Sequence, residues 1–268
     1  MKRRFNKKTV RIHAHVNPLS HGGYSPPLSP EHTDWSKHYP DHFHESKRGN
    51  SESKKVTIVD IGCGFGSLLR TLSVLFPEEL ILGMEIREKA VAICEKKISD
   101  LRSGVNISFR RSRSRRKSGR HKRRRSPSRS SSASSRDGFP PSYDNISVLR
   151  TNVMKFLVHY FEKGQILKMF FCFPDPHFKK SNHRRRIISQ NLLSEYAFVL
   201  QVGGLIYNVT DVEDLFEWTV GHFDDHPLFE KLTEIELKND PCVSAIRDQT
   251  DEALRVSKRK DKKYVCVY

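Results

Sequence analysis

The sequence has 268 residues, with 48 Lys and Arg against 31 Asp and Glu, and a formal net charge of +17. This length allows one ordinary domain or two small ones, and five cysteines without a C-x-x-C pair exclude a disulfide scaffold and a Cys-based zinc module. No apolar run approaches the ~18 residues of a membrane span, so we expect a thiol-reduced intracellular protein with a polyanionic partner.

Residues 1–54 are rich in His, Pro, Ser and Lys and carry little periodic apolar sequence, so we expect a mostly flexible N-terminal arm. Two His-x-His pairs lie in this arm, but we interpret them as part of a solvated tail and predict no metal site. One stretch, residues 34–40, gathers two aromatic residues and a proline. We expect it to dock onto the domain that follows.

From residue 55 onward the sequence alternates between strand and helix patterns, and we expect a single domain over residues 55–268. Apolar spacing predicts, in chain order, a strand at 56–60, a helix at 67–75, a strand at 80–86 and a helix at 89–101.

A segment rich in Arg and Ser, at about residues 110–145, interrupts this alternation at a loop. Between Arg110 and Arg136 it holds 11 Arg, 2 Lys and no acid, so 13 of the 17 net charges lie there. Such a segment cannot bury apolar surface and should be disordered. Its ten serines resemble the Arg/Ser-rich segments of RNA-processing proteins, which leaves two interpretations: a phosphorylation-switched RNA or nuclear-import arm, or a passive insertion.

The alternation resumes after this segment. Asn-Ile-Ser occurs twice, at 106–108 and at 145–147, and we predict that the second copy starts the next strand. We predict strands at 146–150, 168–173, 205–209 and 264–268 and helices at 153–161, 187–200 and 211–223. Repeated βα units predict an α/β fold: a Rossmann-like, doubly wound, mainly parallel seven-stranded sheet with helices on both faces.

A glycine-rich turn, D-I-G-C-G-F-G at residues 60–66, follows the first strand and opens the first helix. Its glycines let the backbone turn sharply and approach a ligand closely. The spacing is G-x-G-x-G, with Ser67 where an NAD fingerprint would continue with Gly or Ala. Glu85 closes the second strand, where it can accept hydrogen bonds from ribose hydroxyls. Together the turn and Glu85 resemble the class I S-adenosylmethionine-dependent methyltransferases, which implies S-adenosylmethionine as the cofactor.

A second motif, F-P-D-P-H-F-K-K at residues 173–180, follows the fourth strand. It places Asp175 at the carboxyl edge of the sheet between two prolines, each of which fixes φ and restricts the residue before it. A carboxylate held this rigidly favours a site group over a surface group. The block 168–186 closely resembles the tRNA (guanine-N7) methyltransferase family, as do residues 83–87, 150–152 and 203–207. The resemblance covers about residues 32–109 and 145–256.

This resemblance implies methyl transfer to N7 of a guanosine in the variable loop of tRNA, forming 7-methylguanosine. Guanine N7 carries an in-plane lone pair that Watson–Crick pairing does not use, so no base needs to remove a proton. Catalysis then reduces to in-line placement and electrostatic stabilisation. We assign Asp175 as the catalytic residue, accepting from guanine N1–H and N2–H₂ and supplying a negative field rather than abstracting a proton.

The resemblance also carries the family's cofactor contacts onto this sequence, where Val and Cys replace a usual Ala and Leu at two positions. The implied cofactor-binding residues are Gly62, Gly64, Glu85, Ile86, Arg87, Asn152, Val153 and Cys172. The family's Thr-x-Glu, which closes over the site, is matched by Thr250, Asp251 and Glu252, and we assign these to substrate binding. Beyond them, residues 257–263 depart from the family's usual Asn-Gly-Gly-like turn.

Basic residues close to Asp175 predict contact with RNA. Positive charge at a helix N-terminus is locally unfavourable, so its presence there indicates binding to a phosphate backbone. The alternative interpretation is that these cations are only solvated at the start of a helix. The predicted RNA contacts are Lys179, Lys180, His183, Arg184, Arg185 and Arg186.

We therefore expect tRNA as the partner, without DNA or membrane. By resemblance, eukaryotic members of the family work with a noncatalytic WD-repeat propeller subunit. We expect a location in the nucleus, with the cytoplasm as an alternative. Two other functions stay open: a methyltransferase acting on another RNA or on protein, and a catalytically silent RNA-binding scaffold. The intact Gly62, Glu85 and Asp175 argue against the scaffold.

Overall fold

The computed structural model of the chain describes residues 16–20, 22–43, 54–104 and 141–268. The Arg/Ser-rich segment, predicted at about 110–145, and the first Asn-Ile-Ser copy at 106–108 fall almost entirely outside the described residues. The second copy starts a strand, as predicted.

A six-stranded sheet forms the centre of the fold, with the strand order β3-β2-β1-β4-β5-β6. The first five strands are parallel and β6 is antiparallel to β5. The mainly parallel, doubly wound arrangement is therefore confirmed. The strands are β1 (Val56–Ile61), β2 (Leu80–Glu85), β3 (Ile146–Arg150), β4 (Ile166–Cys172), β5 (Leu200–Thr210) and β6 (Tyr264–Val267).

The prediction of seven strands is wrong for the described part of the chain. Residues 226–233 lie along the outer edge of β6, where Leu232 N–H donates to Val267 O at 2.9 Å. However, they form turns rather than a ladder, with Phe229 N–H bonded to His226 O and Pro227 between these two residues. Because a proline cannot donate to a ladder, this stretch covers the sheet edge without becoming a strand.

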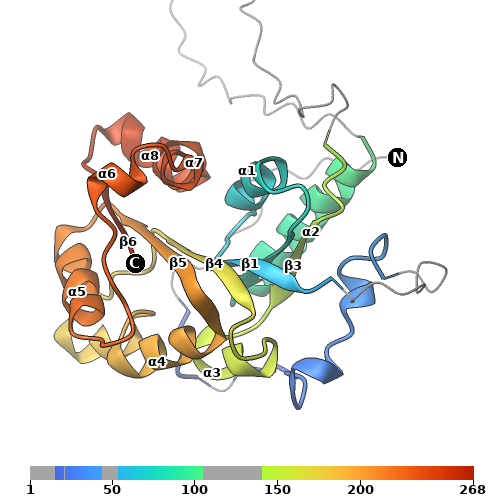
Figure 1. Cartoon of the computed structure of the whole chain (residues 1–268), viewed down its shortest axis with the longest axis horizontal. Helices are drawn as coiled ribbons and strands as arrows, with labels where there is room; N and C mark the ends of the chain where they lie inside the picture. The colour runs from blue at the N-terminus through green and yellow to red at the C-terminus, as the bar shows by residue number, and fades with distance from the viewer. Residues whose placement is uncertain (1–15, 21, 44–53, 105–140) are drawn as a thin grey trace, which may run out of the picture.

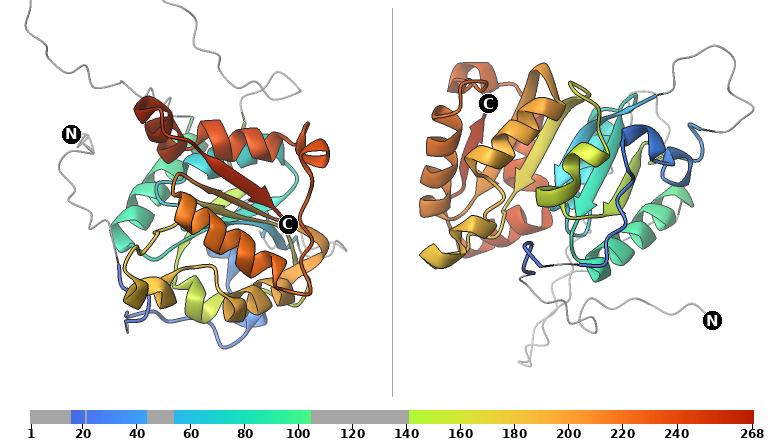
Figure 2. Two further views of the ribbon diagram at one scale, coloured as in Figure 1. Left: turned by 90° about the vertical axis from the view of Figure 1, so that its left-hand side faces the viewer. Right: turned by 90° about the horizontal axis from the view of Figure 1, so that it is seen from below.

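Helices lie on both faces of the sheet, as predicted (Figures 1 and 2). The first half contributes α1 (Ser67–Leu75), α2 (Glu88–Arg102), α3 (Val153–Phe156) and the 3₁₀ turn η4 (Leu157–His159). The second half contributes the 3₁₀ helix η5 (Lys180–Arg185), α4 (Gln190–Val199) and α5 (Glu213–Asp224). Then follow α6 (Glu234–Leu237), α7 (Pro241–Ser244), the π-helical turn η6 (Ala245–Gln249) and α8 (Asp251–Arg259). No helix among the described ranges is long and apolar enough to cross a membrane.

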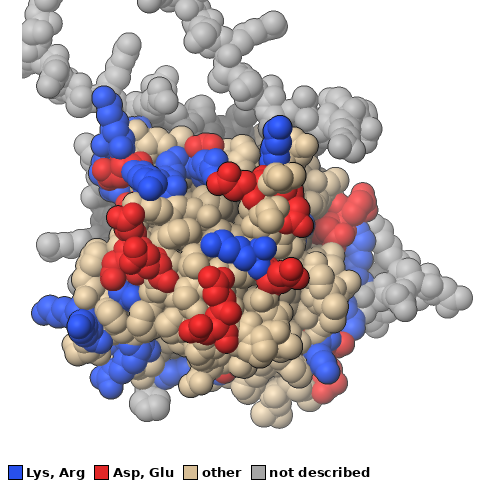
Figure 3. Space-filling view, turned by 60° about the vertical axis from the view of Figure 1, so that its left-hand side comes forward, with Lys and Arg blue, Asp and Glu red and all other residues tan. Residues whose placement is uncertain are grey.

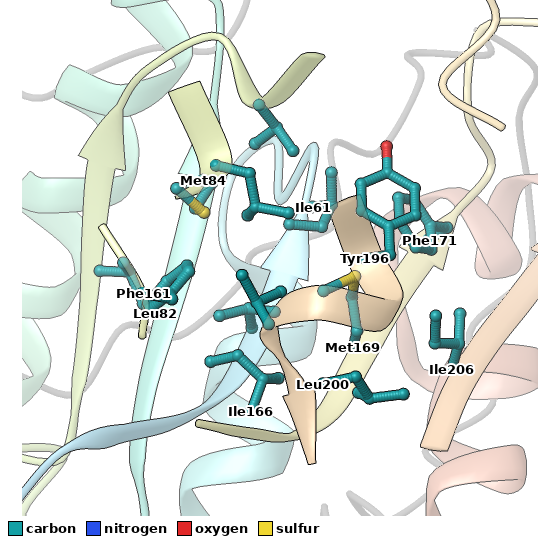
Figure 4. Packing of buried hydrophobic residues seen from close by; sticks show 14 of the residues in the cluster. Ile61, Leu82, Met84, Phe161, Ile166, Met169, Phe171, Tyr196, Leu200 and Ile206 are labelled. Carbon is teal, nitrogen blue, oxygen red and sulfur yellow. The ribbon is translucent and has the colours of Figure 1, made fainter. Parts of the chain in front are cut away.

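Strand alternation divides the core between the two faces of the sheet. Met169 and Phe171 on β4 pack with α4 residues such as Tyr196 (Figure 4). Phe170, between them in the strand, belongs to the cluster on the other face, which includes residues of α1. Successive side chains of a strand point to opposite faces, so a strand buried on both sides needs an uninterrupted apolar run. The sequence M-F-F-C of β4 is such a run.

The aromatic stretch at residues 34–40 docks onto the domain, as predicted. Tyr39 is fully buried and its hydroxyl donates to Ile81 O of β2 at 2.9 Å. Trp35, within the 3₁₀ helix η2 (Trp35–Lys37), stacks on Phe161 with ring centroids 6.3 Å apart. Another 3₁₀ helix, η1 (Pro30–His32), precedes it. The prediction that residues 1–54 are mostly a flexible arm stays a prediction.

The connection from α2 to β3 leaves the described chain at Gly104 and returns at residue 141. Both points lie toward the amino ends of the strands, because Ile81 pairs with Ile146 there while Glu85 pairs with Arg150 at the opposite end. The Arg/Ser-rich segment is therefore attached at the edge of the sheet remote from the carboxyl ends.

Candidate functional site

A cavity of about 570 Å³ lies at the carboxyl ends of β1, β2, β4 and β5. The strand order reverses between β1 and β4, and such switch points are where open α/β sheets bind ligands. The cavity is lined by most of the residues predicted to form the site: Gly62, Gly64, Glu85, Ile86, Arg87, Asn152, Val153, Cys172, Asp175, Arg185, Thr250, Asp251 and Glu252.

The glycine-rich turn forms the floor between β1 and α1. Gly64 has φ 56°, in the left-handed region, and its N–H donates to Glu85 Oε2 at 3.0 Å. At Gly66, with φ 71°, a Cβ would lie 2.4 Å from Cys94 Sγ. Glycine is therefore favoured at Gly64 by backbone conformation, and at Gly66 both by backbone conformation and by the close approach of α2.

The Glu85 carboxylate is 2% exposed and accepts hydrogen bonds on both oxygens. Oε1 accepts from Arg87 N and Arg87 Nε at 2.9 and 3.0 Å, and Oε2 accepts from Gly64 N and Arg87 Nη2, both at 3.0 Å. These bonds raise the pKa of the Arg87 guanidinium, and the charge of Asp175 adds to the effect. A ribose that bound Glu85 would therefore have to replace donors supplied by the Arg87 side chain.

Asp60 and Cys172 face the cavity from the ends of β1 and β4. Burial, together with the charge of Glu85, raises the pKa of Asp60 to about 7. Burial also raises the pKa of the Cys172 thiol well above its ordinary value, so Cys172 presents a neutral thiol to the cavity. In the part of the chain that the structure describes, no three His, Cys, Asp or Glu side chains gather as a metal site.

Val16, Pro18 and Tyr24, which sequence reasoning did not assign to the site, lie at the edge of the cavity. Val16 and Pro18 line it, and Asn152 Nδ2 donates to Pro18 O at 2.6 Å. The Tyr24 hydroxyl donates to Ile86 O at 3.4 Å. The sequence carries no apolar periodicity that would have predicted this placement, because Pro18 makes its contact through the backbone and Tyr24 through a single side chain.

Asp175 lies in a strained loop that follows β4. Phe173 and His177 have φ of 52° and 46°, and Phe173 N–H is fixed to Val209 O of β5 at 2.7 Å. Non-glycine residues in this region carry strain of about 1–3 kcal/mol each, and such strain clusters at functional sites. The Asp175 side chain is solvent-exposed and lines the cavity, as the sequence predicts.

The six basic residues predicted to contact RNA do not form one surface. Lys179, Lys180 and Arg184 are exposed, and Arg185 lines the cavity. His183 is half-buried, edge-on to the ring of Trp218 on α5 at 5.1 Å. The helix predicted at 187–200 is shorter in the structure, where η5 ends at Arg185 and α4 covers Gln190–Val199.

Arg186 departs from the prediction, because its side chain is 1% exposed and turned into the fold. Its guanidinium donates to Pro176 O and to Asp214 Oδ2. A run of cations in a sequence does not reveal which of them points inward. The prediction that Arg186 contacts RNA is therefore wrong.

Thr250, Asp251 and Glu252 begin α8 and close one wall of the cavity. Thr250 Oγ1 accepts from Ala253 N at 3.0 Å and caps the helix, while Asp251 N–H donates to Ser67 Oγ of α1 at 3.0 Å. Asp211, at the end of β5, also lines the cavity and pairs with Arg259 of α8 at 2.7 Å. Sequence reasoning read Asp211 only as a helix start, because its partner lies 48 residues away.

Comparisons with known proteins agree on one family. The family described as "Putative methyltransferase" matches residues 54–266. A tRNA (guanine-N(7)-)-methyltransferase of Kluyveromyces lactis is 45% identical over 262 residues, covering 98% of this chain and 82% of that protein. Proteins of the same name from Zea mays and Arabidopsis thaliana are 41% and 44% identical, again over 98% of this chain and covering 91% and 90% of theirs.

Solved structures similar in fold include a SAM-dependent methyltransferase from Aquifex aeolicus, at 15% identity and a TM-score of 0.41, covering 67% of this chain and 75% of that one. An antibiotic-related methyltransferase has a TM-score of 0.45 at 11% identity, covering 80% of this chain and 88% of that one.

Proposed function

Because the chain belongs to the tRNA (guanine-N7)-methyltransferase family, we propose that it transfers the methyl group of S-adenosylmethionine to N7 of a guanine in tRNA. The observation that carries this proposal is that the glycine-rich turn, Glu85 and Asp175 all line the same cavity. Asp175 lies there between two prolines. On the family resemblance, we extend this proposal to a guanosine in the variable loop.

The residues of the cavity fit S-adenosylmethionine. A Cβ added at Gly62 would meet nothing within 4 Å, so the backbone of the turn faces open space. The Thr151 hydroxyl oxygen is buried without a partner at the cavity wall. The volume of about 570 Å³ lies within the ~300–1,000 Å³ range of ligand pockets. When bound, the cofactor supplies an electrophilic methyl on a sulfonium. Gly62, Glu85 and Asn152 would hold it.

The chain's own task is positioning. Guanine N7 needs no deprotonation, so Asp175 serves as an acceptor for the N1–H and N2–H₂ edge of the base. There it fixes the ring and offsets the positive charge that methylation adds to it. The two prolines and the fixed Phe173 N–H hold the carboxylate in place before the base arrives. A preorganised group of this kind contributes about 10²–10³ in rate.

RNA binding is assigned to the cations beside Asp175 that are exposed, namely Lys179, Lys180 and Arg184. Figure 3 shows that Lys and Arg are interspersed with Asp and Glu on the face of the molecule that carries α5, so this face is not uniformly basic. These three cations, which follow Asp175 in the chain, would therefore bind the phosphate backbone. The base itself would be extruded from its stack to reach the cavity.

We extend the proposal, on the family resemblance alone, to a noncatalytic WD-repeat partner and to a nuclear location. Copurification of a propeller subunit with the tagged chain, and imaging of that chain in cells, test these two points. A chain that is fully active alone and confined to the cytoplasm would contradict both.

The experiment that tests the function incubates the enzyme with labelled cofactor and bulk tRNA, followed by strand cleavage selective for 7-methylguanine. We expect label in tRNA and cleavage in the variable loop. Label without cleavage would indicate another atom or nucleotide, and no label with measurable RNA binding would indicate a silent scaffold. Asp175→Ala should keep cofactor affinity and lose turnover by about 10² or more; turnover near that of the unaltered enzyme would contradict its role.

A further inference from the structure

Arg186 is one of the largest side chains buried in the protein, at 1% exposure. It follows directly on η5, which carries the exposed cations, and precedes the first turn of α4. A guanidinium keeps its charge in proteins, so an arginine that is buried this fully must be paired and hydrogen-bonded. The partners of Arg186 therefore indicate what it does.

One side of the guanidinium reaches the Asp175 loop. Arg186 Nε donates to Pro176 O at 2.9 Å. Pro176 is the residue directly after Asp175, so this charge-assisted bond fixes the Pro176–His177 peptide unit, on the carboxyl side of the catalytic residue. On the amino side the loop is fixed by the bond from Phe173 N–H to Val209 O at 2.7 Å. Asp175 is thus held between two anchors, one on β5 and one on Arg186.

The other side of the guanidinium reaches α5. Arg186 Nη2 donates to Asp214 Oδ2 at 3.0 Å, in the first turn of that helix. The guanidinium carbon lies 4.6 Å from the ring centroid of Trp218, one turn further along. Trp218 Nε1 in turn donates to Ile188 O at 2.8 Å, which holds the ring against the chain that carries Arg186. Arg186 therefore bridges the Asp175 loop and α5.

We propose that Arg186 is a positioning residue for Asp175, acting through Pro176 and braced by α5, and that it takes no part in RNA contact. The inference rests on the proposed function, because Asp175 acts there on the guanine. Only an arginine offers two diverging donors and a flat face for the tryptophan. A displacement of about 1 Å at a reacting centre lowers turnover by about 10²-fold.

The test compares Arg186→Lys with Arg102→Lys. Arg102 is a matched control, because it also ties loops together, donating to the carbonyl oxygens of Tyr143, His38 and Ile146, but lies away from the cavity. We expect Arg186→Lys to lower kcat by about 10²-fold while the cofactor Kd and the tRNA Kd change by less than about threefold. We expect Arg102→Lys to lower the thermal midpoint and leave kcat within about threefold.

Three results would overturn the inference: unchanged kcat in a folded Arg186→Lys, a tRNA Kd that rises in proportion to the loss of kcat, or an equal loss of kcat in Arg102→Lys. If the unaltered enzyme makes no 7-methylguanine, the proposed function fails before any variant is compared, so the two failures are distinguishable.

A second variant and a second readout keep the test decisive if Arg186→Lys does not fold. Asp214 is 69% exposed, so Asp214→Asn should fold, and it removes the ionic part of the contact with α5 while leaving Trp218 in place. We expect kcat to fall in the same direction by a smaller factor. Hydrogen exchange should quicken in the peptide covering residues 173–180 and stay unchanged in β4 in both variants. Exchange in that peptide equal to the unaltered protein would refute the positioning role without any measurement of activity.

Discussion

The buried carboxyl of Asp60 predicts a specific dependence of stability on pH. Burial at the end of β1, with the charge of Glu85 adding to it, raises the pKa of Asp60 from 3.8 to about 7 in the folded chain. In the unfolded chain the group is expected to keep the ordinary value. Between these two values the folded protein holds a proton that the unfolded protein has lost, so stability falls as pH rises.

Asp60→Asn removes this dependence, because an amide does not titrate. From pH 5 to pH 7 the unaltered protein should lose about 2 kcal/mol of unfolding free energy relative to the variant, because the slope of about 1.4 kcal/mol per pH unit falls to half at the folded pKa. The loss should level off above the folded pKa, where Asp60 is ionised in both states. Any constant effect of the amide on packing cancels, because the prediction concerns only the change with pH.

Urea titrations of both proteins without cofactor, at several pH values from 5 to 8, measure the two unfolding free energies. Other titrating groups are common to both proteins and drop out of the difference. A difference between variant and unaltered protein that stays constant over this range would refute the claim that Asp60 is protonated in the fold near neutral pH.

Three further predictions follow from described contacts. Glu85→Gln replaces the carboxylate that is proposed to accept from the ribose hydroxyls with a neutral amide, only one atom of which can accept. At about 1.5–3 kcal/mol for a lost bond to a charged group, calorimetric titration should show cofactor binding weakened at least tenfold. Tyr39→Phe deletes the buried bond to a β2 carbonyl and should cost about 1–2 kcal/mol in urea unfolding, with kcat retained; an unchanged free energy would contradict the docking. Replacing Lys179 and Lys180 together with Ala should raise the tRNA Kd and reduce the salt slope of log K by up to about 2, and an unaltered slope would remove them from the RNA surface.

The sheet was predictable because its strands are buried on both faces and read as apolar runs. β1, β3 and β4 begin or end within two residues of the prediction. β5 begins five residues early, at Leu200, because the next residues, Q-V-G-G, carry no strand pattern and lie at an irregularity of the ladder between the paired residues Leu200 and Leu205. The helix expected at 153–161 ends at Phe156 and continues as a 3₁₀ turn, since Tyr160 and Phe161 are drawn into the core.

The site was predictable where a motif fixes the backbone and not where the fold brings distant residues together. The glycine turn and the Pro-Asp-Pro loop each follow a strand, so their position at the cavity follows from the topology. Contacts such as Asp211 with Arg259, or Asn152 with Pro18, join residues far apart in the chain and leave no local pattern. The inward turn of Arg186 is of the same kind, because Arg184 and Arg185 carry the same charge and yet one is exposed and the other lines the cavity.

The attachment of residues 105–140 at the amino ends of the strands has a consequence for how such a protein diversifies. β2 runs roughly 17 Å from that edge to Glu85, at about 3.3 Å per residue. An insertion at that edge lengthens the connection between α2 and β3 without moving the glycine-rich turn, Thr250 or Asp175, which line the cavity. Selection can therefore extend, shorten or recharge that connection while the methylation chemistry is inherited intact.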